Sequence, residues 1–326
     1  MNSRVNVAIL GAGNIGGVMA ATLNKMKSVR CYAVGSRSKD KAVEFARKFG
    51  CKKAYGSYEE LVEDRKIDLV YIATPHSEHY ENCRLCIEHG KAVLCEKAFT
   101  ANAAQAEALF AYAAEKNVFI TEAMWTRYMP MLATIREVLD SGIIGVPTML
   151  TANLGYTMNG VARLNDPALA GGALLDVGVY TINFASMVFG TEIKKISSVC
   201  TYTKSGVDEQ NSITMVFEDG KMAVLNSSML SQSDRKGMIH GTKGFAVIEN
   251  VNNFESMTIY GEDYKKLARY VRPRQISGYE YEVEASIQAM QEGRMECPQM
   301  PHAETVRIMK IMDGLRYEWG IKYPFE

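Results

Sequence analysis

The sequence has no excess of charge of one sign, since 37 lysines and arginines balance 37 aspartates and glutamates in 326 residues. A chain without net charge has no overall field that attracts nucleic acid or an anionic membrane, so we expect neither as a partner. Although 47% of the residues are apolar, no run approaches the ~18 residues that a membrane-spanning helix needs. The sequence therefore predicts a protein without a signal peptide or a membrane anchor.

Metal-binding patterns are missing as well. The five histidines form no H-x-x-x-H pattern, and the pair Cys83 and Cys86 has no second pair at zinc spacing. We interpret these two cysteines as small buried residues of a helix and expect no metal. Seven cysteines, an odd number, fit a reducing compartment better than a disulfide scaffold, so we predict a cytoplasmic protein.

The first third of the chain alternates short apolar strands with helices. We expect strands at residues 5–10, 31–34, 69–73, 92–95 and 118–121, with a helix between each pair. This rhythm is typical of a doubly wound parallel sheet, which binds ligands beyond the carboxyl ends of its strands. We predict an N-terminal Rossmann domain over residues 1–122 that binds a dinucleotide.

After residue 121 the rhythm changes. Helices are expected near 130–140 and 174–189, a strand at 148–153, six strands between 193 and 260, and two closing helices at 279–292 and 303–319. Strands joined by short turns predict a large, mainly antiparallel open sheet. The fold class is thus α/β, with an α+β second domain over residues 123–326 for substrate binding and oligomerisation. Its last helix can pack back on the first domain.

A glycine-rich segment follows the first expected strand and opens a helix. It reads Gly11-Ala12-Gly13-Asn14-Ile15-Gly16 and matches the G-x-G-x-x-G pattern of dinucleotide-binding proteins. The glycines permit a tight turn and a close approach of the backbone to a pyrophosphate at the helix N-terminus. A glycine-rich turn without a ligand is the weaker alternative, because the flanking strand and helix are both expected.

The end of the second expected strand indicates which cofactor binds. An NAD-binding protein carries an acid there, but this strand leads into Ser36 and Arg37. A hydroxyl and a guanidinium can hydrogen-bond and neutralise a 2′-phosphate, so we predict NADP. A solvated Arg37 and the nearby Asp40 leave NAD open.

Polar residues follow two further strands of the same sheet. Glu96 and Lys97 end the strand at 92–95, and Thr74, His76 and His79 follow the strand at 69–73. Since the carboxyl ends of parallel strands share one edge, we expect these side chains at the cofactor, with Lys97 within reach of the reacting carbon. For the two histidines, capping of the following helix is the alternative.

A second proton-transfer group is expected because hydride transfer leaves a proton to be handled. Asp176 and Tyr180 are four residues apart and so share one face of an otherwise apolar helix. A nearby ammonium would favour the phenolate of Tyr180, which makes it a candidate general acid or base. The alternative is a structural hydrogen bond with a half-buried tyrosine.

Together the glycine-rich segment, Glu96-Lys97 and the Asp176-x-x-x-Tyr180 helix resemble the glucose-fructose oxidoreductase and inositol dehydrogenase (Gfo/Idh/MocA) family over the whole chain. Residues 121–128 and 171–180 resemble its branch of dimeric dihydrodiol dehydrogenases and NADP-dependent D-xylose dehydrogenases. The resemblance implies that Lys97 and Tyr180 are the catalytic pair, with Asp176 in support. It also implies substrate contacts for Trp125 and Arg163, although packing is the alternative for Trp125.

The chain departs from the family where Glu-Lys-Pro has become Glu96-Lys97-Ala98, which removes a ring that restricts φ in the lysine loop. The resemblance implies an NADP-dependent oxidoreductase acting on a secondary alcohol or hemiacetal carbon of a sugar, polyol or cyclic diol. It also implies a homodimer or homotetramer formed through the C-terminal sheet. Two alternatives stay open: another family reaction, such as biliverdin-type reduction or aldose-aldose oxidoreduction, and a non-catalytic NADP-binding sensor.

Overall fold

The computed structural model describes residues 4–326 and divides them into two units. The first comprises residues up to 125 together with 275–310, and the second comprises 126–274 together with 311–326. The predicted domains were residues 1–122 and 123–326, and only the last helix of the second domain was expected to pack on the first. In the structure the first unit includes the helix before it, Glu280–Gln291, and the last helix, His302–Glu318, is divided between the two units after residue 310.

The first unit contains a six-stranded sheet in the order β3-β2-β1-β4-β5-β6, and every pair in it is parallel. Its strands are β1 (Val5–Leu10), β2 (Val29–Gly35), β3 (Lys53–Tyr55), β4 (Leu69–Ile72), β5 (Ala92–Glu96) and β6 (Ile120–Ala123). The strands β4, β5 and β6 are buried at every residue, as expected for a parallel sheet covered on both faces. The predicted Rossmann sheet is confirmed.

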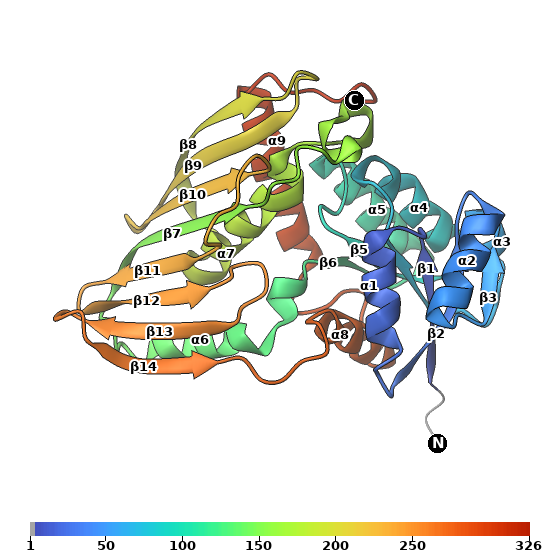
Figure 1. Ribbon diagram of the computed structural model, residues 1–326, viewed down its shortest axis with the longest axis horizontal. Coiled ribbons are helices and arrows are strands. Elements are labelled where there is room, and N and C mark those ends of the chain that lie inside the picture. The colour runs from blue at the N-terminus through green and yellow to red at the C-terminus, as the bar shows by residue number, and fades with distance from the viewer. Residues whose placement is uncertain (1–3) are drawn as a thin grey trace. The chain divides into compact units, whose positions relative to one another are not determined.

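Helices cover both faces of this sheet. They are α1 (Asn14–Leu23), α2 (Lys39–Phe49), α3 (Tyr58–Val62), α4 (His76–Glu88), α5 (Ala103–Lys116) and α8 (Glu280–Gln291). Figure 1 shows α1 and α2 on the near face and α4 and α5 on the far face. Side-chain caps by Ser38, Ser57 and Asn102 begin α2, α3 and α5, because each oxygen accepts a backbone N–H of the first turn.

The second unit is built on an eight-stranded sheet in the order β14-β13-β12-β11-β7-β10-β9-β8. The strands are β7 (Pro147–Gly155), β8 (Ile193–Tyr202), β9 (Asp208–Phe217), β10 (Met222–Ser228), β11 (Gly237–Gly241), β12 (Gly244–Glu249), β13 (Ser256–Gly261) and β14 (Lys266–Val271). All pairs are antiparallel except β7 with β10. The predicted mainly antiparallel sheet is confirmed.

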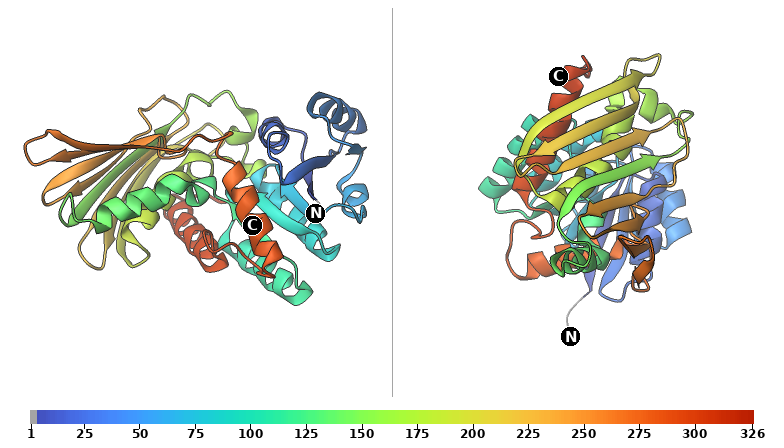
Figure 2. Two further views of the ribbon diagram at one scale, coloured as in Figure 1. Left: turned by 90° about the horizontal axis from the view of Figure 1, so that it is seen from below. Right: turned by 90° about the vertical axis from the view of Figure 1, so that its left-hand side faces the viewer.

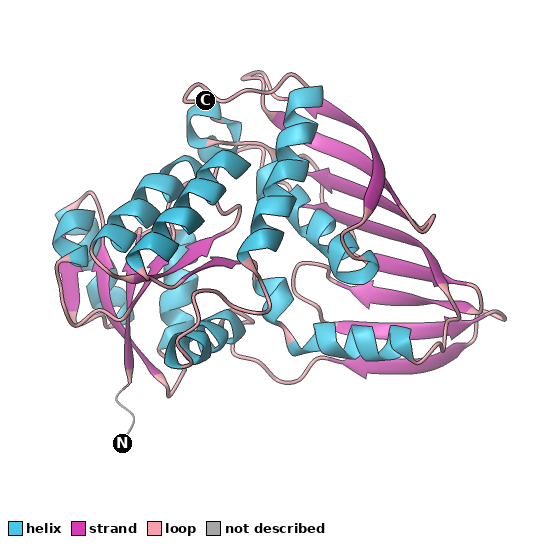
Figure 3. Cartoon of the chain, turned by 180° about the vertical axis from the view of Figure 1, so that it is seen from behind, coloured by secondary structure: helices cyan, strands magenta, loops and turns pink. Residues whose placement is uncertain are grey.

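One face of this sheet packs against helices. Seen from behind, α6 (Pro130–Asp140) and α7 (Val179–Phe189) lie in front of the strands (Figure 3). Buried and more exposed residues alternate along β9 and β10, which fits a sheet with one face in the core. In the right-hand view of Figure 2, no helix of residues 4–326 covers the outer face.

A helix spans the predicted range 174–189, but its first turn is not α-helical. Leu174–Gly178 is a π-helix, and the α-helix α7 starts only at Val179. Single π turns inside helices occur often at functional sites.

Among the described residues, Pro167–Phe189 is the one helical stretch long and apolar enough to cross a membrane, and 89% of its most apolar window is buried within the protein.

Candidate active site

The glycine-rich turn forms a cradle at the carboxyl end of β1. Gly11 has a φ of 113°, which a residue with a side chain rarely adopts, and a Cβ there would lie 2.7 Å from the carbonyl oxygen of Ala73. A Cβ on Gly16 would lie 2.4 Å from the carbonyl oxygen of Gly11. Apart from its chain neighbours and the backbone of α1, no described residue has an atom within 4 Å of a Cβ built on Gly13, so the space in front of Gly13 is open.

The N-terminus of α1 opens onto the same space. Gly13 is its N-cap, no side chain caps the helix, and no acid lies in its first turn. Backbone N–H groups near Asn14 and Ile15 are therefore available to an anion, which the helix dipole also favours. The residues fit a dinucleotide pyrophosphate at this turn.

The end of β2 carries the residues expected at the adenosine ribose. Ser36 is buried, its backbone N–H bonds to the carbonyl oxygen of Tyr55, and its hydroxyl accepts the backbone N–H of Ser38. Arg37 is exposed, so its guanidinium remains accessible to a ligand. The acid Asp40 lies in the first turn of α2 and not on the strand end.

Lys97 directly follows β5, and His79 ties its loop to the end of β4. The Nδ1 atom of His79 lies 3.0 Å from the carbonyl oxygen of Ala98, and Nε2 lies 2.9 Å from that of Thr74. Complete burial lowers the pKa of His79 to about 4, although these carbonyls oppose the shift. The neutral ring carries one N–H, so it donates to one of the two loops and packs against the other.

Two other predicted residues of this edge, Thr74 and His76, contact residues of α4. Thr74 accepts a hydrogen bond from the side-chain amide of Asn82, and His76 is buried at the start of α4, edge-on to the ring of His79. The peptide bond between Lys97 and Ala98 is cis. For His76, helix capping and a cofactor contact both stay open. His79 contacts the loop that carries Lys97 and the end of β4.

Glu96, which precedes Lys97, belongs to a buried acid cluster with Tyr71 and Glu282. Tyr71 and Glu282 were not predicted as site residues. Glu96 accepts a hydrogen bond from the hydroxyl of Tyr71 and another, of 3.2 Å, from the backbone N–H of Lys97. Both carboxylate oxygens of Glu282 are buried without a hydrogen-bond partner among residues 4–326. Burial and the neighbouring Glu96 raise the pKa of Glu282 well above its usual range. Glu282 lies on a helix with an ordinary amphipathic pattern, which gives no signal for its burial.

Replacing Tyr71 with phenylalanine is expected to lower the free energy of unfolding by about 1–3 kcal/mol, because the buried carboxylate of Glu96 loses one of its hydrogen-bond donors. Denaturant unfolding monitored by circular dichroism measures the change. Tyr32→Phe is the matched control, since the hydroxyl of Tyr32 shares its acceptor Asp64 with Lys53 and Tyr55. Equal losses in the two variants would contradict a special role for the Tyr71 bond.

In the second unit Asp176 lies within the π turn, where both terminal nitrogens of Arg163 reach its Oδ1 atom at 3.1 Å. Asp176 is buried, while the Arg163 side chain is 43% exposed. The structure thus brings these two predicted site residues together. Asp176 lies in the π turn and Tyr180 in α7, so the two residues are not on one regular α-helix, as had been predicted from their four-residue separation.

Tyr180 lies in the first turn of α7 and is buried, with 7% of its surface exposed. The helix is clamped one turn later by Arg127, whose Nε atom donates to the side-chain oxygen of Asn183 at 2.6 Å. Thr181 lies 3.3 Å from the hydroxyl of Ser227 on β10. The helix that carries Tyr180 is therefore held by buried contacts with Arg127 and with β10.

Trp125 packs in the first unit. Its ring stacks on Tyr279 with 4.2 Å between centroids, and its indole nitrogen is buried without a hydrogen-bond partner among the described residues. This contact accounts for its burial by packing, and its substrate role stays a prediction. Lys97 lies in the first unit and Tyr180 in the second, so their convergence also stays a prediction.

The family follows from comparison with known proteins. The model of the oxidoreductase family with an NAD-binding Rossmann fold, Gfo/Idh/MocA, matches residues 5–124, and the Gfo/Idh/MocA C-terminal domain matches residues 132–247. The chain is 34% identical to trans-1,2-dihydrobenzene-1,2-diol dehydrogenase of Mus musculus over 329 residues, which cover 97% of each chain. The chain belongs to the Gfo/Idh/MocA family. The predicted family and the prediction of an oxidoreductase are confirmed.

The chain is also similar to a second dihydrodiol dehydrogenase and to two solved structures. Trans-1,2-dihydrobenzene-1,2-diol dehydrogenase of Homo sapiens is 33% identical over 298 residues, covering 90% of this chain and 89% of its own. The 3-ketoreductase KijD10 of Actinomadura kijaniata, solved with NADP and TDP-benzene, has a TM-score of 0.88 at 24% identity, covering 97% and 98% of the two chains. The aldose-aldose oxidoreductase of Caulobacter crescentus, solved with glycerol, also scores 0.88, at 19% identity over 98% of each chain. At these identities the two solved structures show a shared fold.

Proposed function

We propose that this chain is an NADP-dependent dehydrogenase or reductase that transfers hydride between nicotinamide and a secondary alcohol or hemiacetal carbon. The observation that carries the proposal is the position of Lys97, a half-buried lysine that directly follows β5 in the sheet whose glycine-rich turn suits a dinucleotide, on a loop that His79 contacts. Small cyclic diols, sugars and polyols are the proposed substrates, since similar family members carry those names.

The bound nicotinamide would supply the carbon that accepts or releases hydride. In the oxidative direction Lys97 would stabilise the phenolate of Tyr180, and this phenolate would take the proton of the substrate hydroxyl and become a neutral phenol. Asp176 would hold Arg163, with which it already forms a charge-assisted contact, at the substrate. The proposal requires the Tyr180 hydroxyl and the Lys97 ammonium to meet at the reacting carbon in the holoenzyme.

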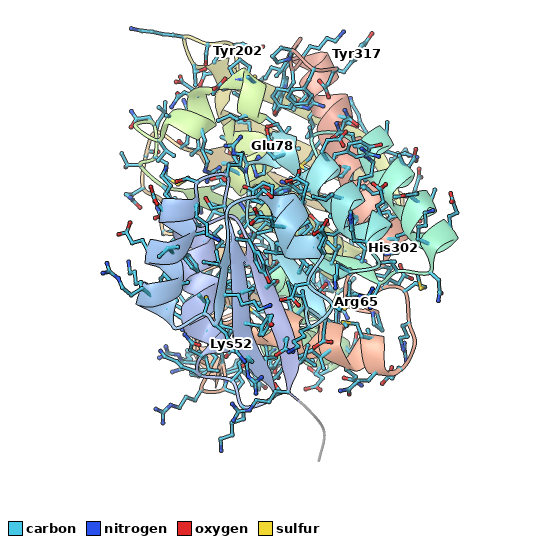
Figure 4. All side chains as sticks on the ribbon, turned by 90° about the vertical axis from the view of Figure 1, so that its right-hand side faces the viewer. Lys52, Arg65, Glu78, Tyr202, His302 and Tyr317 are labelled. Carbon is cyan, nitrogen blue, oxygen red and sulfur yellow. The ribbon has the colours of Figure 1, made fainter. Side chains whose placement is uncertain are left out.

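The preference for NADP is proposed from Ser36 and the exposed Arg37. Replacing Arg37 with alanine should raise the Kd of NADPH about ten- to a hundredfold, because a charge-assisted bond to the 2′-phosphate is lost, and should leave the Kd of NADH nearly unchanged. Nucleotide fluorescence titration measures both constants. The matched control is Arg65→Ala, an exposed arginine labelled in Figure 4. Equal weakening of NADPH and NADH would contradict recognition of the 2′-phosphate.

The substrate class is tested by following NADPH absorbance with a panel of aldoses, inositols and cyclic trans-diols, and with the matching ketones. Turnover with a diol or sugar is the expected result. A sensor that binds NADP without catalysis predicts cofactor binding and no turnover with any compound. Reduction of a biliverdin-type acceptor, or transfer between two aldoses with retained cofactor, would replace the proposed reaction with another one of the family.

The proposed quaternary state is a homodimer or homotetramer formed through the outer face of the second unit's sheet. That face carries a groove of about 530 Å³ lined by residues of β7, β8, β9 and β10, among them Asn153, Ser212 and Asn226. Exposed Val199 on β8 and Met222 on β10 add apolar surface. Light scattering of the purified protein distinguishes an oligomer from a monomer of 36.2 kDa. A cytoplasmic location is proposed because the chain has seven cysteines, an odd number that fits a reducing compartment.

A further inference from the structure

The π turn that carries Asp176 is anchored by a residue outside the predicted site. The backbone N–H of Leu174, its first residue, donates to Oδ2 of Asp208 at 2.7 Å, and both residues are buried. The side-chain amide of Asn211 donates to the same oxygen at 2.9 Å. Asp208 begins β9, 34 positions beyond the turn that it holds.

The chain before the turn is shaped to admit this carboxylate. Gly172 has a φ of 117°, and a Cβ there would lie 2.3 Å from Oδ1 of Asp208. The neighbouring carbonyl of Gly171 accepts a hydrogen bond of 2.9 Å from the hydroxyl of Tyr323. The two glycines thus enter the turn between Asp208 and Tyr323, and a side chain on Gly172 would displace the carboxylate.

Several charged or titratable groups act on Asp208. Arg316 of α9 (His302–Glu318) favours its ionised form, and the same guanidinium lies 4.4 Å from the ring centroid of Tyr323. Cys200 and Tyr202 of β8 and Tyr323 of the C-terminal segment also interact electrostatically with it. Burial nevertheless outweighs the hydrogen bonds and Arg316, and raises the pKa of Asp208 to about 6.

Burying a carboxylate costs free energy, which a structural hydrogen bond to Leu174 alone would not require. The amide oxygen of an asparagine could accept the bond from Leu174 without a buried charge. A carboxylate accepts more strongly, and its charge interacts favourably with the N-terminal end of the helical segment that follows. These properties matter most where a helix turn must be held in one geometry.

We propose that Asp208 is a positioning residue for catalysis: it holds the π turn so that Asp176 and Tyr180 keep the geometry of proton transfer. The inference rests on the proposed role of Tyr180. Small displacements of a proton-transfer group can cost up to about a hundredfold in rate, so a loosened turn is expected to lower kcat more than substrate or cofactor affinity.

The ionisation of Asp208 then predicts an acid limb in the profile of kcat against pH. Above pH 6 the carboxylate accepts both hydrogen bonds, and below pH 6 the neutral carboxyl accepts them more weakly, so kcat falls. The same titration does not unfold the protein. Because the folded pKa lies above the unfolded value of about 3.9, the folded form binds the proton more tightly, and this group adds stability as the pH falls from about 6 toward 4.

The test compares Asp208→Asn and Asn211→Ala with the matched control Asp219→Asn, an exposed turn residue between β9 and β10. At pH 8 the Asn variant should lose about tenfold in kcat, with nearly unchanged KM and NADPH Kd, and should lack the acid limb. Asn211→Ala keeps the carboxylate but removes a donor, so its limb should move to higher pH. If kcat falls at the wild-type pH in both variants, the proposal is overturned.

Hydrogen exchange of the amides at 172–180, measured without substrate, separates this inference from the proposed function. Faster exchange is expected in Asp208→Asn and wild-type exchange in Asp219→Asn, because only the first loosens the turn. Unchanged exchange in the Asn variant would overturn the inference. If Tyr180→Phe keeps full turnover, the proposed function fails while the exchange result still decides the anchoring. Should Asp208→Asn not fold, Asn211→Ala carries both measurements.

Discussion

Replacing Lys97 with methionine is expected to lower kcat more than about a hundredfold, since a group that assists proton transfer typically contributes that much or more. Methionine keeps the length and the apolar stem but removes the charge. Single-turnover measurements with NADPH and a ketone substrate, or with NADP and an alcohol, report the chemical step directly. The Kd of NADPH should change little, because the glycine-rich turn and Arg37 contribute most of the proposed cofactor contacts.

The loop that carries Lys97 is held by His79 and by Glu96, so the substitution should not disturb it. Lys52→Met is the matched control, since Lys52 is an exposed lysine of the same unit, labelled in Figure 4. It should retain wild-type turnover. Turnover of Lys97→Met within the range of that control would remove Lys97 from the mechanism and favour a sensor.

Replacing Tyr180 with phenylalanine is expected to lower kcat by about 10²- to 10⁴-fold, the range of a lost general acid or base. Phenylalanine preserves the buried ring on α7, so thermal unfolding should be close to that of the wild type. Tyr317→Phe is the control, because Tyr317 is 89% exposed on α9 and labelled in Figure 4. A variant that unfolds at the same temperature but turns over normally would contradict a proton-transfer role.

The double variant Lys97→Met/Tyr180→Phe tests whether the two groups act together. If they serve one proton transfer, the double variant should be about as slow as the slower single variant, because neither group can act without the other. Multiplied losses would indicate two independent steps. A holoenzyme crystal structure with the phenol and the ammonium out of mutual contact would contradict the pair directly.

Much of the fold could be predicted because strongly periodic elements reveal themselves locally. The bounds of β1 and α6 were predicted to the residue. The strand β3 was missed because it has three residues and no buried position, and β14 because an exposed edge strand such as Lys266–Val271 shows no apolar alternation. Both lie at the edges of their sheets, where pairing and not burial defines the strand.

By itself the sequence determined the Rossmann sheet, the glycine-rich turn, the strand-end positions of Ser36 and Lys97, and the family resemblance, because each depends on residues adjacent in the chain. Only the tertiary structure decided how these residues are held. The acid cluster of Tyr71, Glu96 and Glu282 and the π turn anchored by Asp208 join segments far apart in the chain. A buried carboxylate leaves no local pattern, since its energy depends on partners that only folding brings within hydrogen-bond distance.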